Sequence, residues 1–510
     1  METLIYDCFI ESKTGLQIPL LKSGRTVESR YDPQKEVLKQ CSQIKQETHF
    51  VIITGIAGGI LIKTILENRP DIFIIAVENN CAEIEFLKQS SIVKSFENSF
   101  NICLCTIDQL EQKINQYYVP AFYGNLEVLE QKAWLQENTQ LKEKLFNIIR
   151  HAISVVSADF SVQSHFGKLW QHNIMSNVQF IKNTNPDILP SKQELKKTAV
   201  VLAAGPTIDS TVQRLIKNPD QYYIIATDTA FSILADHGLK ADAVVSLDGQ
   251  NISGTHFIHN SFYDKAKTIF IFDLSANSSA VKKVISQNAA VLFFKSGHPF
   301  CEYICKKYKI ELPYLYSGSG TVTISAVDFA VKCGFEKILV FGADFGFSKG
   351  KPYAKGTYLD RLYKTCNTRF FTDEKQFTNL MYRTKTFTSG KRITTQILEA
   401  YKKSFEEYLL NSGLSFIYEN DCYEIVNTKT AETENSVLYN NTSLKITSEV
   451  LAQDILRDGK NRFFTDFSSL SFKDISLLPL ISWLRYHDNK KEVDFKYFYN
   501  LALKYFERYL

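Results

Sequence analysis

Short apolar runs that end in glycine or polar residues recur along the chain and alternate with stretches of helical periodicity. An apolar run at 50–54 leads into a glycine-rich turn at 55–59. A second run ends at Glu78, and a third covers 100–105. A strand, a glycine-rich turn, a helix and a strand that ends in an acid are typical of a Rossmann-like half domain. Because these glycines match the dinucleotide fingerprint only loosely, the pattern also fits a structural module that binds no ligand.

A second series of apolar runs begins near residue 196. The run at 198–204 is almost continuously apolar, which is typical of a buried parallel strand. Further runs of this kind lie at 222–226, 243–247, 268–272, 290–294 and 338–341. Helical patterns separate these runs, and strands that alternate with helices predict an α/β fold with a doubly wound parallel sheet. We therefore predict a central Rossmann-like domain.

Other stretches have the three/four spacing of helices. This spacing predicts helices at 126–135, 141–149 and 395–410, the last followed by a short strand at 416–418. A segment rich in Pro and Asn at 183–191 predicts a domain boundary. The predicted organisation is a Rossmann-like α/β domain at 1–122, a helical connector at 123–190, a central domain at 191–394 and a mostly helical region at 395–510.

Composition narrows the class of protein. Apolar residues make up 45% of the chain and charged residues 22%, the balance of a soluble globular protein. A net charge of +4 over 510 residues gives no support for a nucleic-acid or membrane partner. We find no apolar run long enough to cross a bilayer and no secretory signal. The ten cysteines include no Cys-x-x-Cys pair, so we expect reduced thiols and a cytoplasmic location.

Small, hydroxylic and acidic residues follow the strands of the predicted central sheet. Ligands of open parallel sheets bind beyond the carboxyl ends of the strands, so these residues are the candidate site. They are Gly205, Pro206, Thr207, Asp228, Thr229, Asp248, Gly342 and Asp344, together with Ser317, Gly318, Ser319, Gly320, Thr321 and Thr323 in the turn before a helix.

This set of residue types fits a nucleotide. Hydroxyls and backbone N–H groups at a helix N-terminus bind phosphate, and carboxylates accept hydrogen bonds from ribose or base. Each element also has a plain structural explanation, because 317–321 could be a helix cap, and Asp228 and Asp248 could be turn residues. Their coincidence at one sheet edge favours the nucleotide. The chain has no P-loop, protein-kinase motif or G-x-S-x-G elbow, and without a D-x-D motif we predict no metal.

Five segments resemble known glycosyltransferases. They are Val200–Asp209, Ile225–Ala230, Ala241–Asp248, Ser319–Thr323 and Cys333–Phe345. Together they resemble the bacterial motility-associated factor (Maf) glycosyltransferases, and the central motifs are similar to those of bacterial sialyltransferases. The resemblance implies a GT-A-like sialyltransferase type of central domain. It also implies transfer of a nonulosonic acid, such as pseudaminic or legionaminic acid, from a CMP-linked donor to Ser or Thr of flagellin, as flagellar assembly and motility require.

The resemblance also implies roles for individual residues. The turn at 205–207 would lie near the CMP phosphate or ribose, and the hydroxyls at 319–323 would bind the phosphate. Asp228 lies where the sialyltransferases have an asparagine, and Asp248 lies near the position of a second asparagine. The reaction would invert the anomeric centre and need no cofactor. No histidine at 385–392 matches the catalytic histidine of the sialyltransferases, so the base is unassigned.

Three further residues are candidates for assisting the leaving phosphate. They are Tyr353, Lys355 and Tyr358, which follow the last motif and equally fit a surface loop.

Two other functions remain open. The central domain also resembles an archaeal pterin diphosphokinase, which would bind ATP with magnesium, although the long additions at both ends argue against it. A flagellin-binding accessory protein without catalysis is the second alternative. For the N-terminal domain we predict no binding of NAD or S-adenosylmethionine, and a role in assembly or acceptor docking.

Overall fold

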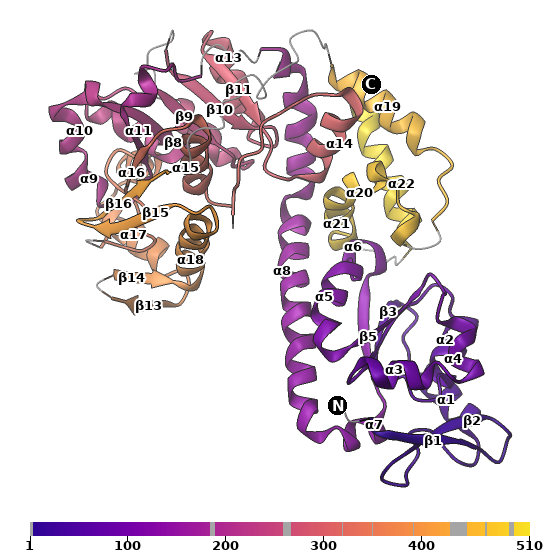
Figure 1. Cartoon of the computed structure of the whole chain (residues 1–510). Coiled ribbons are helices and arrows are strands. Elements are labelled where there is room, and N and C mark those ends of the chain that lie inside the picture. Colours follow the sequence, from indigo (N-terminus) through magenta and orange to yellow (C-terminus); the bar gives the residue numbers. More distant parts are fainter. Residues whose placement is uncertain are drawn as a thin grey trace. The chain divides into compact units, whose positions relative to one another are not determined.

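A computed structural model describes residues 4–183, 189–258, 267–318, 320–348, 350–390, 392–428, 446–464, 467–488 and 494–510. The chain forms two compact units (Figure 1). The first comprises Met1–Lys168 and Asp454–Leu510, and the second comprises Leu169–Gln453. This division differs from the expected segments, because the end of the chain belongs to the first unit and the expected connector is divided between the two.

The first unit contains a parallel sheet of four strands in the order β5-β4-β3-β6. The strands are β3 (Thr48–Thr54), β4 (Phe73–Glu78), β5 (Ile102–Thr106) and β6 (Asn125–Glu130). Helix α2 (Ile60–Asn68) follows the glycine-rich turn after β3. The expected Rossmann-like half domain is therefore present.

The prediction of a helix at 126–135 is wrong for residues 126–130, which belong to strand β6. The structure places 125–130 in a strand parallel to β3, with Phe50 opposite Leu126 and Ile52 opposite Val128. The apolar positions at 126, 128 and 129 fit a short strand as well as a helix. Pairing with the exposed backbone edge of β3 decides between the two, because that edge offers partners for the backbone groups of 125–130.

The remaining elements of the first unit surround this sheet. An antiparallel hairpin of β1 (Tyr6–Glu11) and β2 (Gln17–Leu21) precedes it. The helices are α1 (Pro33–Cys41), α3 (Cys81–Leu87), α4 (Ser91–Phe96), α5 (Ile107–Tyr117), α6 (Pro120–Tyr123), α7 (Lys132–Glu137), α20 (Phe472–Ser476), α21 (Leu478–Tyr486) and α22 (Phe495–Phe506). Helices α8 (Thr139–Asn177) and α19 (Ser448–Gly459) contribute residues to both units.

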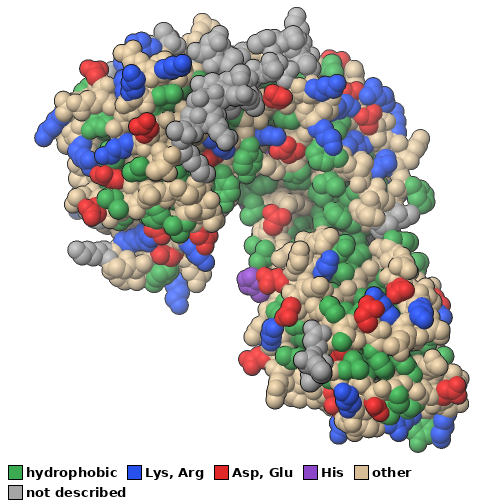
Figure 2. Space-filling model, viewed as in Figure 1, with side chains coloured by type: hydrophobic (Ala, Val, Ile, Leu, Met, Phe, Trp, Pro, Cys, Tyr) green, Lys and Arg blue, Asp and Glu red, His purple; other side chains and the backbone are tan. Residues whose placement is uncertain are grey.

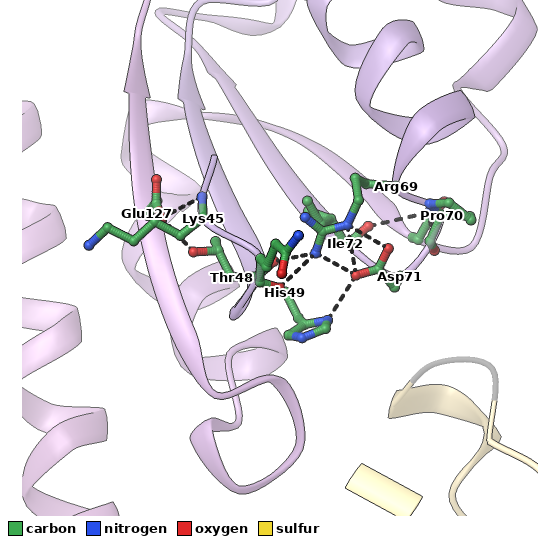
Figure 3. Close-up of polar contacts among 10 residues, drawn as sticks. Lys45, Thr48, His49, Arg69, Pro70, Asp71, Ile72 and Glu127 are labelled. Atoms are coloured by element: carbon green, nitrogen blue, oxygen red, sulfur yellow. Dashed lines mark hydrogen bonds and ion pairs between the residues drawn. The ribbon is translucent and has the colours of Figure 1, made fainter. Parts of the chain in front are cut away.

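Polar contacts hold the amino ends of the first sheet (Figure 3). The Arg69 guanidinium donates to Asp71 at 2.7–3.2 Å and to the Thr48 carbonyl at 3.0 Å, and His49 Nδ1 lies 2.9 Å from the same carboxylate. Hydrogen bonds from His49 and Arg69 lower the pKa of Asp71 despite its burial. The Thr48 hydroxyl donates to Glu127, which links β3 to β6.

The second unit contains a mixed sheet of eight strands in the order β11-β10-β9-β8-β7-β12-β16-β15. Its first six strands are parallel. The strands are β7 (Thr198–Leu202), β8 (Tyr222–Thr227), β9 (Ala243–Ser246), β10 (Ile269–Asp273), β11 (Ala290–Phe294), β12 (Lys337–Phe341), β15 (Ser415–Glu419) and β16 (Cys422–Val426). The strand order reverses between β7 and β12, so the sheet is doubly wound, as predicted.

Helices connect the strands of this sheet. They include α9 (Ile208–Thr211), α10 (Gln213–Lys217), α11 (Asp228–Asp236), α12 (Thr255–Ile258), α13 (Ser278–Ser286), α14 (Pro299–Tyr308) and α15 (Val322–Cys333). After β12 follow α16 (Tyr358–Thr365), α17 (Asp373–Met381), a hairpin of β13 (Thr386–Ser389) and β14 (Arg392–Thr395), and α18 (Gln396–Asn411).

One helical stretch, Thr139–Lys182, is long and apolar enough to cross a membrane by length and composition alone. Its most apolar window has a mean hydropathy of 1.2 and is 17% buried. We expected no such run from the sequence. One helix that meets this test by length and composition alone is weak support for a membrane span.

Candidate functional site

A cavity of about 380 Å³ lies at the carboxyl ends of β7, β8 and β12. This is the point where the strand order reverses, and ligands of doubly wound sheets bind there. Its volume falls in the range of about 300–1,000 Å³ that is typical of small-molecule sites. The residues after β7, β8 and β12, the start of α15 and parts of α17 and α18 form its walls.

The cavity brings together eight of the predicted residues. They are Gly205, Asp228, Thr229, Thr321, Thr323, Gly342, Asp344 and Tyr353. Eight others do not line it, namely Pro206, Thr207, Asp248, Ser317, Gly318, Gly320, Lys355 and Tyr358. Ser319 lies outside the described residues.

Gly205 and Gly342 are required by the packing of two turns against each other. The Gly205 amide donates to the Gly342 carbonyl at 2.8 Å. A Cβ on Gly205 would lie 2.4 Å from that carbonyl oxygen, and a Cβ on Gly342 would lie 2.4 Å from the Ala203 carbonyl oxygen. Gly342 also has a φ of +70°, which favours glycine. These glycines therefore join the ends of β7 and β12 at the floor of the cavity.

Asp344 ties the same two turns together through its side chain. It accepts a hydrogen bond from the Thr207 amide at 3.0 Å and another from the Thr207 hydroxyl. Burial raises the pKa of Asp344, and these two bonds oppose the shift. Thr207 thus supports the site by positioning Asp344, although it does not line the cavity.

Asp228 is buried at the end of β8. It accepts hydrogen bonds from the Ser246 hydroxyl at 2.7 Å and from the Thr229 amide at 2.7 Å. Burial raises its pKa, while His256 nearby acts in the opposite direction. The His256 ring packs edge-on against Tyr358 at 4.7 Å, and its Nδ1 has no hydrogen-bond partner among the described residues. No motif marked His256, so sequence reasoning missed it.

The start of α15 points at the cavity through Thr321, Val322 and Thr323. Thr321 is the N-cap residue, but its hydroxyl makes no capping hydrogen bond. The first N–H groups of a helix have no partner within the helix and carry partial positive charge. Both the amides and the Thr321 hydroxyl can therefore bind an anion.

An apolar wall faces these polar groups. It consists of Leu380 and Met381 from α17 and Ile397, Leu398 and Tyr401 from α18. The sequence could not identify this wall, because apolar residues at helical spacing look the same in a core. Burial raises the pKa of Tyr353 beside it, so this hydroxyl stays protonated and can donate a hydrogen bond.

The described lining residues include no Lys or Arg. Within the described lining, the α15 N-terminus is therefore the group that carries partial positive charge. Lys349 and Lys391 lie outside the described residues.

The glycine-rich turn of the first unit has its backbone amides occupied by side chains of the chain itself. The Gly58 amide donates to Glu28 at 2.6 Å, and the Ile56 amide donates to Glu78 at 2.7 Å. Trp134 Nε1 donates to Glu78 at 2.7 Å, and its ring lies 2.6 Å from the position of a Cβ on Gly55. Burial raises the pKa of both carboxyl groups to about 8.

The chain matches a family model and two proteins of related sequence. Residues 172–350 match the family described as "6-hydroxymethylpterin diphosphokinase MptE-like". An uncharacterized protein of Treponema pallidum (strain Nichols) is 33% identical over 152 residues, 30% of this chain and 71% of that protein. A second uncharacterized protein of this organism is 37% identical over 141 residues, 27% of this chain and 50% of that protein.

Among solved structures, the chain is similar to the MAf glycosyltransferase from Magnetospirillum magneticum AMB-1. The TM-score is 0.48 and the sequence identity 12%, and the match covers 100% of this chain and 91% of the other.

Proposed function

This chain belongs to the same family as the Treponema pallidum protein to which it is 33% identical, and we propose that it is a glycosyltransferase. In this proposal it moves a nonulosonic acid from a CMP-linked donor to a Ser or Thr hydroxyl of flagellin, in the cytoplasm. The observation that carries the proposal is the cavity at the strand-order reversal, where a free helix N-terminus, hydroxyls and carboxylates meet. The motif resemblance supplies the class of donor.

The cavity supports a nucleoside monophosphate. The α15 amides and the Thr321 hydroxyl would bind the phosphate. Asp228 lines the cavity and accepts hydrogen bonds from Ser246 and Thr229. Hydroxyl groups of the ribose or amino groups of the base would donate further hydrogen bonds to it. The apolar wall of α17 and α18 would exclude water from the sugar, which strengthens the electrostatic interactions within the site.

The proposed step is a single displacement. The acceptor oxygen forms a bond to the anomeric carbon while the bond from that carbon to the phosphate oxygen breaks, and CMP leaves with the electron pair. Tyr353 lines the cavity and would donate a hydrogen bond to the departing phosphate. The acceptor proton passes to a general base, which contributes roughly 10²–10⁴-fold to the rate. The step assigns no role to Lys355 and Tyr358, because neither lines the cavity.

The family match at 172–350 favours a second candidate, an ATP-dependent diphosphokinase acting on a pterin. The same helix N-terminus would then bind the phosphates of ATP with magnesium. An accessory protein that binds flagellin without catalysis is the third candidate.

Two experiments separate these functions. Thermal unfolding of the full chain with CMP in EDTA, and with ATP plus magnesium, distinguishes the donors. We expect stabilisation by CMP, and stabilisation by ATP and magnesium alone would contradict the proposal. Mass spectrometry of flagellin after incubation with the protein and CMP-nonulosonic acid then tests catalysis, and unmodified flagellin together with clear CMP binding would favour the accessory function.

A further inference from the structure

The excess positive charge of the chain lies in one segment beside the cavity. Residues 349–392, here called the basic segment, contain 11 Lys or Arg and three Asp or Glu, a formal net charge of +8. The whole chain carries +4, so the rest of it is net negative by 4. Uniformly scattered charge would give this segment a net charge near zero.

The basic segment also exposes aromatic side chains to solvent. The exposed fraction is 83% for Phe370, 44% for Phe371, 54% for Tyr382 and 41% for Phe387. Single exposed apolar residues are common, but a cluster of large ones marks an interaction site. These four exposed rings lie within 18 residues of sequence.

Three cations of this segment are exposed and make no ion pair with a described residue. They are Arg369, Arg383 and Lys385. Other cations of the segment are paired, for example Arg361 with Asp236 at 2.8 Å and Arg392 with Glu399 at 2.7 Å. The three exposed cations therefore contribute charge that other parts of the described chain do not neutralise.

Cations and rings lie beside one another on this surface. The Arg369 guanidinium lies 6.0 Å from the Phe370 ring centroid, and the Lys375 ammonium lies 5.8 Å from that of Phe371. Figure 2 shows Lys and Arg side chains near apolar ones around the region where Figure 1 places β13 and β14. We call Arg369, Phe370, Phe371, Tyr382, Arg383, Lys385 and Phe387 the basic-aromatic surface.

This surface adjoins the cavity along the chain. Met381 and Thr384 line the cavity, while the neighbouring Tyr382, Arg383 and Lys385 are exposed. The segment 381–385 therefore contributes to the cavity wall and to the surface outside it. A polymer that docks on the surface could place one of its groups in the cavity.

We propose that the basic-aromatic surface docks an acidic segment of the acceptor polypeptide. Carboxylates of that segment contact Arg369, Arg383 and Lys385, and its apolar side chains pack on the exposed rings. The placement of an acceptor hydroxyl in the cavity rests on the proposed glycosyltransferase function. The docking itself rests on charge complementarity and on the exposed rings.

The charge distribution favours a short acidic peptide segment over an extended polyanion. Nucleic acid and anionic membranes gain affinity from many phosphate contacts over a long or wide surface. Beyond the basic segment this chain is net negative, so a larger polyanion would meet repulsion there. A local acidic segment meets only the positive surface.

The test measures binding of the full-length chain to a fluorescent peptide that contains Ser, Thr, several Asp and Glu, and two Leu. A second peptide has Lys in place of each acid. We expect the variant Arg369→Glu/Arg383→Glu/Lys385→Glu to bind the acidic peptide at least about tenfold more weakly than the wild type. The control Lys217→Glu/Lys282→Glu/Lys283→Glu makes the same charge change at exposed positions of α10 and α13 and should change the affinity less than about twofold.

A second variant, Phe370→Ala/Phe371→Ala, tests the rings without changing charge and should also weaken binding. Equal losses in the charge variant and its control, or preference for the Lys peptide, would overturn the proposal. So would stronger binding, dependent on this surface, to phosphatidylserine vesicles or to an oligothymidylate.

Stabilisation by CMP, measured on the same variants, keeps the two proposals apart. If the wild-type protein binds CMP but not the acidic peptide, the donor assignment stands and the docking proposal is wrong. If the protein binds the peptide through this surface but is not stabilised by CMP, the docking proposal stands and the proposed glycosyltransferase function is wrong.

Discussion

The four-stranded and the eight-stranded sheet of this protein each have a strand, a turn and a helix at the position where Rossmann-like folds bind ligands. In the first unit, the Ile56 and Gly58 amides are occupied by Glu78 and Glu28. In the second unit, the corresponding edge holds a cavity of about 380 Å³. The same local pattern therefore gives an open site only where no other part of the chain fills the turn.

The segments that reach each turn explain the difference. In the first unit, strand β1 supplies Tyr6, whose hydroxyl donates to Glu78 at 2.9 Å, and α7 supplies Trp134 to the same carboxyl. In the second unit, α17 and α18 stand far enough from β7 and β12 to leave the cavity between them. Four predictions test this contrast, from the largest expected effect to the smallest.

The largest effect is expected for Glu28→Gln, which keeps the shape of the side chain and removes its titration. Burial raises the pKa of Glu28 from 4.5, the ordinary value of a glutamate in the unfolded chain, to about 8 in the folded protein. The folded state thus binds the proton more tightly, so this group stabilises the fold fully below pH 4.5 and the effect is lost as the pH rises to 8. Between pH 4.5 and pH 8, the free energy of unfolding of the wild type should therefore fall by roughly 3–5 kcal/mol more than that of the variant.

Denaturant unfolding of both proteins at several pH values measures this effect. Glu67→Gln makes the same substitution at an exposed position of α2, away from the turn, and is the matched control. Identical pH profiles for wild type and Glu28→Gln would show that the Glu28 carboxyl is not desolvated at the turn.

The second prediction concerns the open site. CMP at about 100 times its dissociation constant should raise the free energy of unfolding by roughly 2.7 kcal/mol, without added metal. Because CMP has no room at the closed turn, Glu28→Gln should give the same increase. Calorimetric melting with and without CMP measures it, and an increase that depends on magnesium would argue against the metal-free site.

The third prediction uses the start of α15. Thr321→Ala should lower CMP affinity about 10- to 100-fold, because a hydrogen bond to a charged group contributes roughly 1.5–3 kcal/mol. Its effect on stability should be small, since the Thr321 hydroxyl makes no capping bond. Ser90→Ala is the control with the opposite expectation, because the Ser90 hydroxyl caps α4 by accepting a hydrogen bond from the Ile92 amide at 3.2 Å.

Titration calorimetry and thermal melting of both variants provide the comparison. Ser90→Ala should cost about 1 kcal/mol of stability and leave CMP affinity unchanged. A Thr321→Ala protein with native CMP affinity would place the phosphate elsewhere.

The smallest effect is expected for cofactors of the Rossmann type. NAD and S-adenosylmethionine should not shift the melting temperature of the full chain, because Glu28, Glu78 and Trp134 occupy the turn that would bind them. A clear shift with either cofactor, abolished by Gly58→Val, would mean that the turn can open.

The sequence by itself predicted β3, β4 and β5 of the first sheet, β7–β12 and β15 of the second, and the chemical types at the carboxyl ends of the parallel strands. Buried parallel strands are continuous apolar runs, so 50–54 and 198–204 stood out locally. Carboxyl ends of parallel strands share one edge, so Asp228, Thr321 and Asp344 could be expected together before any coordinates, and the cavity does bring them together.

Only the tertiary structure decided which turn is open. Glu28 lies 30 residues before Gly58, and Trp134 lies 56 residues after Glu78, so no local pattern relates them. The same holds for strand β6, which the edge of β3 selects, and for the wall formed by Leu380 and Leu398. Local sequence determines which backbone conformation a segment favours, whereas filling of a cavity depends on side chains that only long-range packing brings to it.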